Sequence, residues 1–344
     1  MKSLRTITRD ALDSFVPMTM NSIHDGQFNI KRKIILSIVC FAFIGMMPLY
    51  AQQASAVLHH QGTVTVYSPA NFKTVFTDAT DGDTIYISEG IVSEGIGCGN
   101  QVTIIGAGQN TVISGDLAIG GGSKIANMNI TGKLSDPGYA MFGETQVSQC
   151  RISLSSYTSY SIDVEKFTFD RCYIENFDLR DNVSVLNVIG CKIGRLFGSS
   201  TADKATFRNC LFKQIDNEAG RYPCIATYTD CVIGGFSAVN FYNETTYINC
   251  LFYADAGLQE KITNSTTQNC WYNTDFTVDD DINCSLTDAQ LVAAGYVGTD
   301  DTAVGCGGGV APYTLTPAVP HITNHTISVD SKTRKLNVSL TIGN

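Results

Sequence analysis

The stretch Phe207-Arg-Asn-Cys-Leu-Phe212 returns 21 residues later as Tyr228-Thr-Asp-Cys-Val-Ile233. Both stretches belong to a repeat that runs from Gln149 to Tyr272. The repeat is marked by cysteines 19 to 22 residues apart: Cys150, Cys172, Cys191, Cys210, Cys231, Cys250 and Cys270. A period near 20 residues without helical patterning is typical of a solenoid built from short strands.

The positions around each cysteine alternate as they would in a strand. The third residue before the cysteine is aromatic or β-branched, and the second residue after it is Ile, Phe or Tyr. Because side chains alternate between the faces of a strand, the cysteine and its second neighbour share the inner face. The residue before the cysteine is mostly Gly, Asn or Asp, which tolerate the left-handed backbone of a sharp corner. Stacked coils would therefore place the cysteines in one buried core column.

The N-terminal half carries further motifs of a known fold. Ser68 to Ala79 resembles the short helix that caps parallel β-helices, and Asp81 to Gly90 and Gln101 to Gly115 resemble the first two coils. On these residues the chain resembles the right-handed parallel β-helix of the pectate-lyase-like superfold, and its ending resembles that of secreted Bacteroidota proteins without assigned activity. The resemblance implies an all-β, right-handed parallel β-helix solenoid with an N-terminal capping helix and a C-terminal β-hairpin tail, and implies no particular activity.

The first 51 residues read as a leader with a secretory signal peptide over about residues 31–51. A basic Lys31-Arg-Lys33 is followed by an apolar run to Met47 and by Ala51, a small residue suited to cleavage. The apolar run of 14 residues is shorter than the roughly 20 needed to cross a bilayer. We therefore predict an exported chain, secreted or at the cell surface, with no membrane span after cleavage.

The rest of the chain divides into three parts. We predict the β-helix over 57–284, a C-terminal cap and glycine-rich loop over 285–311, and a proline-containing linker with a β-hairpin over 312–344. Thr287 and Gln290 fit a capping box, which predicts a short helix that covers the open end of the solenoid.

The seven cysteines of the repeat, which we call the ladder cysteines, are predicted to be free thiols. Stacked positions about 4.8 Å apart are farther than the roughly 3.5–4.5 Å between the Cβ atoms of a disulfide. Among the other cysteines, Cys284 and Cys306 flank a loop region and are the better candidates for a pair, while Cys98 and Cys224 are left open. No CxxC motif occurs, which argues against a zinc site.

The net charge of the chain limits the kinds of partner that it is expected to bind. The formal net charge is −9, and without the first 51 residues it becomes −12, because 17 basic and 29 acidic residues remain. An acidic body argues against nucleic acid and anionic membranes as partners. Glycans and the host or cell-surface matrix stay open as partners.

Catalytic motifs of the fold are incomplete. A lyase needs a base together with Ca²⁺ or cationic side chains, yet the outward Arg151 and Lys192 are separated by the coil of Tyr173 and lack an acidic cluster. Asn273-Thr-Asp275 and Asp279-Asp280 superficially resemble polygalacturonase motifs, but they are four residues apart and lie beyond the last patterned coil. No catalytic residue is assigned, and we lean towards a protein that is not an enzyme.

No cofactor is assigned either. Asp279 to Asp281 could offer oxygen ligands to Ca²⁺, and the alternative is a solvated acidic loop.

Aromatic side chains offer a route to glycan binding, because an exposed ring can stack on a sugar. The candidate glycan contacts are Tyr173, Tyr253 and Trp271, and Tyr157 and Tyr160 are further candidates for exposure. The sequence thus predicts an exported, non-catalytic binding module. Two alternatives remain: a polysaccharide lyase or glycoside hydrolase of the same fold, and a structural or assembly component that docks through its terminal hairpin.

Overall fold

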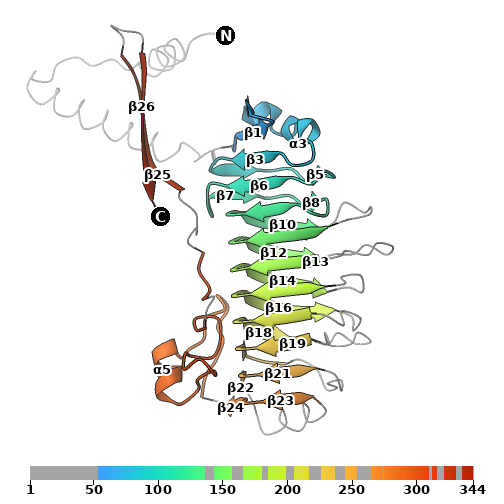
Figure 1. Ribbon diagram of the computed structural model, residues 1–344, viewed down its shortest axis with the longest axis vertical. Helices are drawn as coiled ribbons and strands as arrows, with labels where there is room; N and C mark the ends of the chain where they lie inside the picture. Colours follow the sequence, from blue (N-terminus) through green and yellow to red (C-terminus); the bar gives the residue numbers. More distant parts are fainter. Residues whose placement is uncertain are drawn as a thin grey trace, which may run out of the picture. The chain divides into compact units, whose positions relative to one another are not determined.

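The computed structural model describes 53–135, 143–156, 166–179, 185–198, 205–216, 226–236, 245–253, 265–273, 275–309 and 312–315, and the backbone of two strands within 321–343. In it the chain forms a parallel β-solenoid of about seven turns with little helix (Figure 1). The predicted leader and signal peptide, residues 1–51, lie outside the described residues. Among the helices described, none is long and apolar enough to cross a membrane.

Two sheets of 12 strands form the walls of the solenoid. Sheet 1 contains, in spatial order, β2 (Thr63–Tyr67), β1 (Ala56–His60), β3 (Thr84–Ile87), β6 (Thr103–Gly106), β9 (Lys124–Ala126), β11 (Glu144–Ser148), β13 (Lys166–Asp170), β15 (Leu186–Ile189), β17 (Ala205–Arg208), β19 (Ala226–Thr229), β21 (Thr246–Ile248) and β23 (Thr266–Gln268). Sheet 2 contains β24 (Trp271–Asn273), β22 (Leu251–Tyr253), β20 (Val232–Ile233), β18 (Leu211–Ile215), β16 (Lys192–Gly198), β14 (Tyr173–Leu179), β12 (Arg151–Ser156), β10 (Asn129–Ser135), β7 (Thr111–Ile113) and β4 (Gly90–Val92), with β8 (Leu117–Ile119) and β5 (Ile96–Cys98) beside them. From β3 onward all pairings in both sheets are parallel, whereas β1 is antiparallel to β2 and β3.

The register confirms the repeat that the sequence predicts. Phe207 pairs with Tyr228 in sheet 1, and Phe212 pairs with Ile233 in sheet 2, so equivalent positions of successive coils lie above one another. The inner aromatic rings stack directly: the centroids of Phe207 and Tyr228 are 4.9 Å apart, with an interplanar angle of 9°. These side chains are almost completely buried and form the central core.

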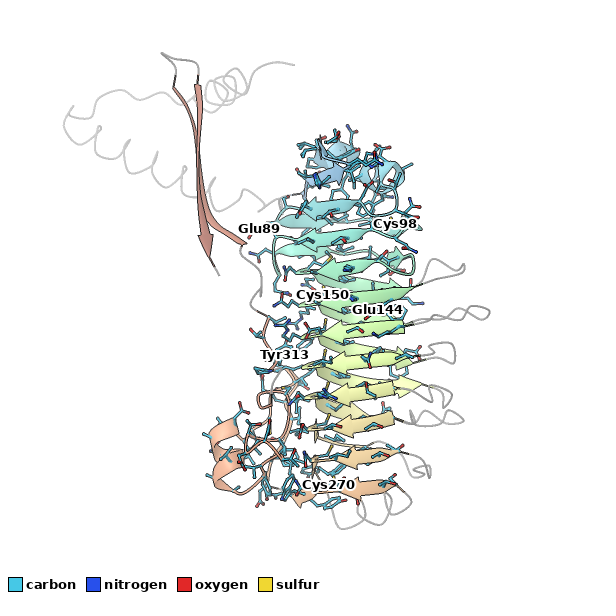
Figure 2. The ribbon with its side chains drawn as sticks, viewed as in Figure 1. Glu89, Cys98, Glu144, Cys150, Cys270 and Tyr313 are labelled. Carbon is cyan, nitrogen blue, oxygen red and sulfur yellow. The ribbon has the colours of Figure 1, made fainter. Side chains whose placement is uncertain are left out.

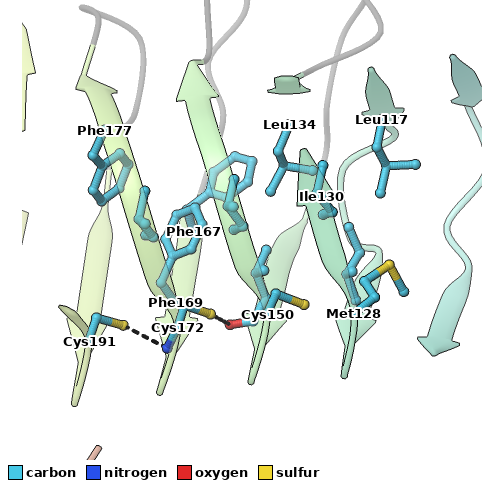
Figure 3. Packing of buried hydrophobic residues seen from close by; sticks show 14 of the residues in the cluster. Leu117, Met128, Ile130, Leu134, Cys150, Phe167, Phe169, Cys172, Phe177 and Cys191 are labelled. Carbon is cyan, nitrogen blue, oxygen red and sulfur yellow. Dashed lines mark hydrogen bonds between the residues drawn. The ribbon is translucent and has the colours of Figure 1, made fainter. Parts of the chain in front are cut away.

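The ladder cysteines each lie one residue before a strand of sheet 2, in the predicted buried column (Figure 3). Six have no exposed surface, and only Cys270, in the last coil, is partly exposed. Their thiols donate to backbone carbonyls, as Cys172 Sγ does to Val147 O at 3.5 Å, and Cys191 Sγ accepts the Cys172 N–H at 3.2 Å. Burial raises the pKa of the Cys150 and Cys172 thiols, so both stay protonated.

The corner before each cysteine has a left-handed backbone, with φ between 51° and 58° from Gln149 to Asn269. The Gly, Asn and Asp corners confirm the prediction. Gln149 and Arg171 adopt the same conformation although neither residue favours it. The register of the stacked strands therefore fixes the corner, whatever residue occupies it.

The N-terminal motif forms a 3-10 turn, Pro69–Asn71, and the helix α3, Thr74–Asp78, whose Val75 and Phe76 join the core. Near the other end, α5 spans Asp288–Ala293, and the predicted capping box between Thr287 and Gln290 is present. The terminal hairpin also forms, from β25 (His321–Asp330) and β26 (Lys335–Gly343). Its turn, 331–334, lies outside the described residues.

The C-terminal segment, residues 275–309 with 312–315, makes contacts that the sequence did not predict, whereas its expected role as a cover for the open end of the solenoid stays a prediction. It folds back along the outer face of sheet 2 (Figure 1), where Phe276, Ile282 and Leu291 are buried. The segment packs on this face because the outward residues Leu211 and Val232 are apolar. Together with residues of the segment they form a second core cluster.

Asp230 occupies a corner under this segment. Gly305 N–H donates to its backbone carbonyl at 3.1 Å. The carboxylates of Asp230 and Asp300 both lie close to Gly298, where an added Cβ would be about 3 Å from an oxygen of each. Burial, with a smaller contribution from Asp300, raises the pKa of Asp230. Neighbouring corners use asparagine instead, as at Asn209 and Asn249.

We expect Asp230→Asn to stabilise the fold at neutral pH. A raised pKa means that folding opposes ionisation, so the penalty is full above the folded-state pKa and disappears below the ordinary Asp pKa of about 3.9. Denaturant titrations should give the variant a higher midpoint at neutral pH and an advantage that shrinks on acidification. A lower midpoint at neutral pH would contradict this account.

We expect Cys210→Ser or Cys231→Ser to lower the free energy of unfolding by roughly 1–3 kcal/mol, because a more polar hydroxyl replaces a fully buried thiol. Equilibrium denaturation measures the change. Cys284→Ser, at a partly exposed position, is the control and should lose less. Equal losses at all three positions would show that the ladder is not the more tightly packed site.

Candidate binding face

The aromatics predicted as glycan contacts lie under the C-terminal segment. Tyr173 is only 6% exposed, so the exposure that the prediction required is absent there, and the prediction is wrong for this residue. The partly buried Tyr253 and Trp271 pack edge to face, against Phe276 at 6.0 Å and Tyr296 at 6.3 Å respectively. The rings of Tyr253 and Trp271 therefore pack against the C-terminal segment. Tyr157 and Tyr160 lie outside the described residues.

The cations on the outer face of sheet 2 also contact this region. Lys192 Nζ donates to Asn283 Oδ1 at 2.5 Å and lies 5.1 Å from the ring of Tyr313. Figure 2 labels Tyr313, which lies beside the solenoid. Lys213 forms an ion pair with Asp280, which holds the pKa of that carboxyl below its ordinary value, and the Arg151 guanidinium lies 4.3 Å from the Tyr173 ring. Lys192 and Lys213 therefore help to position the segment, and Arg151 packs on the Tyr173 ring beneath it.

The acidic loop does not gather into a ligand set. Asp279 accepts the Asn283 N–H at 2.8 Å, and Asp280 faces Lys213. In the part of the chain that the structure describes, no three His, Cys, Asp or Glu side chains converge as metal ligands. The arrangement therefore gives the predicted Ca²⁺ role of Asp279 to Asp281 no geometric support.

The expected pair Cys284 and Cys306 is not a disulfide, and Cys98 is also a free thiol. Cys306 is 8% exposed within the second core cluster, and burial raises its pKa to about 12. Cys284 packs against the same cluster. Both thiols thus fill apolar space, as the ladder thiols do. Cys224 lies outside the described residues.

A small cavity of about 180 Å³ lies at the N-terminal end, between Phe72 and Val92 and beside the ion pair of Lys73 and Glu94. Ligand pockets usually enclose about 300–1,000 Å³. The cavity is therefore a weaker candidate than an open face of the sheets.

A regular row of polar side chains lies on the outer face of sheet 1. It occupies the position four residues before each ladder cysteine. Five of its members are threonines, one is a glutamine and one is an asparagine, so none carries a charge. Its members are Gln146, Thr168, Asn187, Thr206, Thr227, Thr246 and Thr266. We call this set the threonine row. In the first six strands it faces outward, because the residues on either side of it, such as Ala205 and Phe207, are buried. In β23 all three residues are exposed.

Strand pairing fixes the spacing of the row. Its seven members occupy consecutive strands about 4.8 Å apart, so the row extends over roughly 29 Å. Thr206 and Thr266 are exposed, and the other members are partly exposed. Thr206 Oγ1 donates to Asn187 Oδ1 at 2.8 Å, which links neighbouring coils. Because threonine is stiff at χ1, the row presents its hydroxyls and methyl groups in a nearly fixed pattern.

Two ion pairs lie beside the row. Glu144, the first residue of β11 (Figure 2), forms an ion pair with Lys166 at 3.0 Å, and its hydrogen bond to Lys166 holds its pKa below the ordinary value. Asp170 pairs with Arg171 at 2.6 Å. Arg208, exposed two residues after Thr206, adds a further cation to this face. The row itself is polar and uncharged, which suits an uncharged ligand rich in hydroxyl groups.

Sequence reasoning missed this row although its signal is present. The column four residues before the cysteine contains threonine in five of seven coils. The prediction followed the apolar columns and the exposed aromatics, and so passed over a short polar side chain that recurs at a fixed place. A search of every column for any recurring residue type would have found it.

We expect Phe276→Ala to loosen the C-terminal segment from sheet 2. Phe276 is fully buried, and removal of such a ring lowers the free energy of unfolding by about 3–5 kcal/mol. Trp271 is the only tryptophan, so its emission should shift to the red and be quenched more readily. Val292→Ala, at a 43% exposed position of α5, is the control. Unchanged emission in Phe276→Ala would contradict a packed segment.

Comparison with family models, with curated proteins and with solved structures finds no match to this chain. The functional argument therefore rests on the geometry described above.

Proposed function

We propose that the chain is an exported, non-catalytic binding module of the right-handed parallel β-helix type, and that it binds neutral glycans at the cell surface or outside the cell through the threonine row. In this proposal α3 is the N-terminal cap and about residues 31–51 act as the signal peptide. The observation that supports this proposal most directly is the in-register row of uncharged polar side chains over seven strands.

The chemistry of threonine supports a glycan ligand. A sugar ring presents hydroxyl groups at its edge and C–H groups on its face, and each threonine presents one hydroxyl and one methyl group. Stiff side chains lose little conformational freedom on binding, which lowers the entropic penalty of association. Each contact is weak, but a polymer that meets several coils at once gains affinity through repetition.

We infer a non-catalytic protein from the contacts that its cationic side chains make. Lys192, Lys213 and Arg151 contact the C-terminal segment or the ring beneath it, so these cations are occupied. A lyase would need such cations free beside a base. No observation favours the lyase, hydrolase or assembly alternatives over the binding module.

The test begins with a glycan array and continues with calorimetry on the best neutral glycan. Thr227→Val with Thr246→Val removes two hydroxyls and keeps the side-chain shape. If each hydroxyl contributes about 1 kcal/mol, affinity should fall roughly 10- to 30-fold. Thr131→Val with Ser153→Ala removes two hydroxyls from the outer face of sheet 2 and should leave affinity unchanged.

Two outcomes would overturn the proposal. One is a glycan array without any bound ligand, or equal affinity in both double variants. The other is the release of reducing ends or of unsaturated uronides from a polysaccharide panel, which would identify an enzyme instead.

A further inference from the structure

Exposed apolar side chains gather at the N-terminal end of sheet 1. In the described part of the chain four large hydrophobic residues are exposed, and three of them lie here: Val64 at 62%, Val66 at 71% and Tyr86 at 47%. The fourth, Val292, belongs to α5. Single exposed apolar residues need no explanation, but a cluster marks an interaction surface.

The register joins these residues into a strip. Val66 pairs with Val57, Val57 with Tyr86, Tyr86 with Ile105, and Ile105 with Ala126, so apolar residues cross five hydrogen-bonded strands on the outer face. The next strand brings Ser148 to this position, followed by Asp170. The strip is therefore confined to the end of the sheet. Beside it, the column of the threonine row continues past Gln146 as Lys124, Thr103 and Thr84.

The strip ends on an open strand edge. Among the described strands, β2 is the last of sheet 1 and pairs only with β1. Its sequence, Thr63-Val-Thr-Val-Tyr67, contains no proline and no charge, the residues that usually protect an edge from pairing with another chain. Its residues also favour the strand conformation. The edge thus offers unpaired backbone groups beside an apolar strip.

We propose that β2 pairs antiparallel with β2 of a second copy of this chain, about a two-fold axis at Thr65. In this register Thr65 faces its own equivalent, Val64 faces Val66 of the second copy, and Thr63 faces Tyr67. All five residues of β2 find a partner, and the four valines meet on one outer face, where they continue both apolar strips. The two copies then share one sheet across the junction.

A head-to-tail pairing of β2 with β23 fits less well. The outward residues of β23 are Thr266 and Gln268, which would place polar side chains beside Val64 and Val66. Such a heterologous contact would also generate an open filament rather than a closed dimer. Since the edge is only five residues long, it buries less than the roughly 800 Å² per partner of a stable complex, so the dimer should depend on concentration.

Cysteine substitution on β2 tests the axis directly. In an antiparallel pair, opposing Cα atoms are about 4.5–5.5 Å apart, within the 4.4–6.8 Å range of a disulfide. Thr65→Cys should therefore give a disulfide-linked dimer when oxidised glutathione accepts the two electrons. Thr63→Cys, exposed on the same strand, is the matched control, because its two copies would be about 13 Å apart.

Sedimentation of the full-length chain tests the apolar strip. The wild type should shift from monomer to dimer as its concentration rises, and Val66→Lys should remain a monomer over the same series, because two added cations would meet the valine cluster. If Val66→Lys failed to fold, the two cysteine variants would still decide the matter. A wild type that stays monomeric, a larger polymer, or equal cross-linking of Thr63→Cys and Thr65→Cys would overturn the proposal.

Discussion

Parallel, in-register pairing of successive coils is the constraint on which this structure depends. Each backbone hydrogen bond between coils also fixes which side chains lie above one another, so a choice at one position is repeated about every 4.8 Å. Inside, this produces the column of cysteines and the stacked rings of Phe207, Tyr228 and Tyr247. Outside, the same constraint produces the threonine row. Core and candidate binding face are therefore two consequences of one register.

The fold could be predicted from the sequence because burial limits the choice of residue. The inner positions of the repeat are mostly apolar residues or thiols, and the corner favours Gly, Asn or Asp, so both columns were visible from Cys150 to Cys270. Gln149 and Arg171 depart from this preference, yet cooperative pairing holds them in the same left-handed conformation. Neighbouring coils thus override the preference of a single residue.

The candidate site was harder to predict because outer positions have weaker constraints. Leu211, Val232 and Leu251 are apolar and outward, which signals a cover, but no local pattern shows that residues after 275 provide it. The same long-range packing removed Tyr173 from solvent, so this ring lacks the exposure that a glycan contact needs. The threonine row was visible only as a recurring column, since a single surface threonine has no distinctive environment.

The C-terminal segment changes how the solenoid should unfold. In a simple repeat protein each coil contacts only its neighbours, so the end coils can separate one at a time. Here one segment contacts outward residues from β14 to β24, from Tyr173 and Lys192 to Trp271. Separation of the last coil therefore requires the segment to leave several coils together. The segment thus couples coils of sheet 2 that do not touch one another.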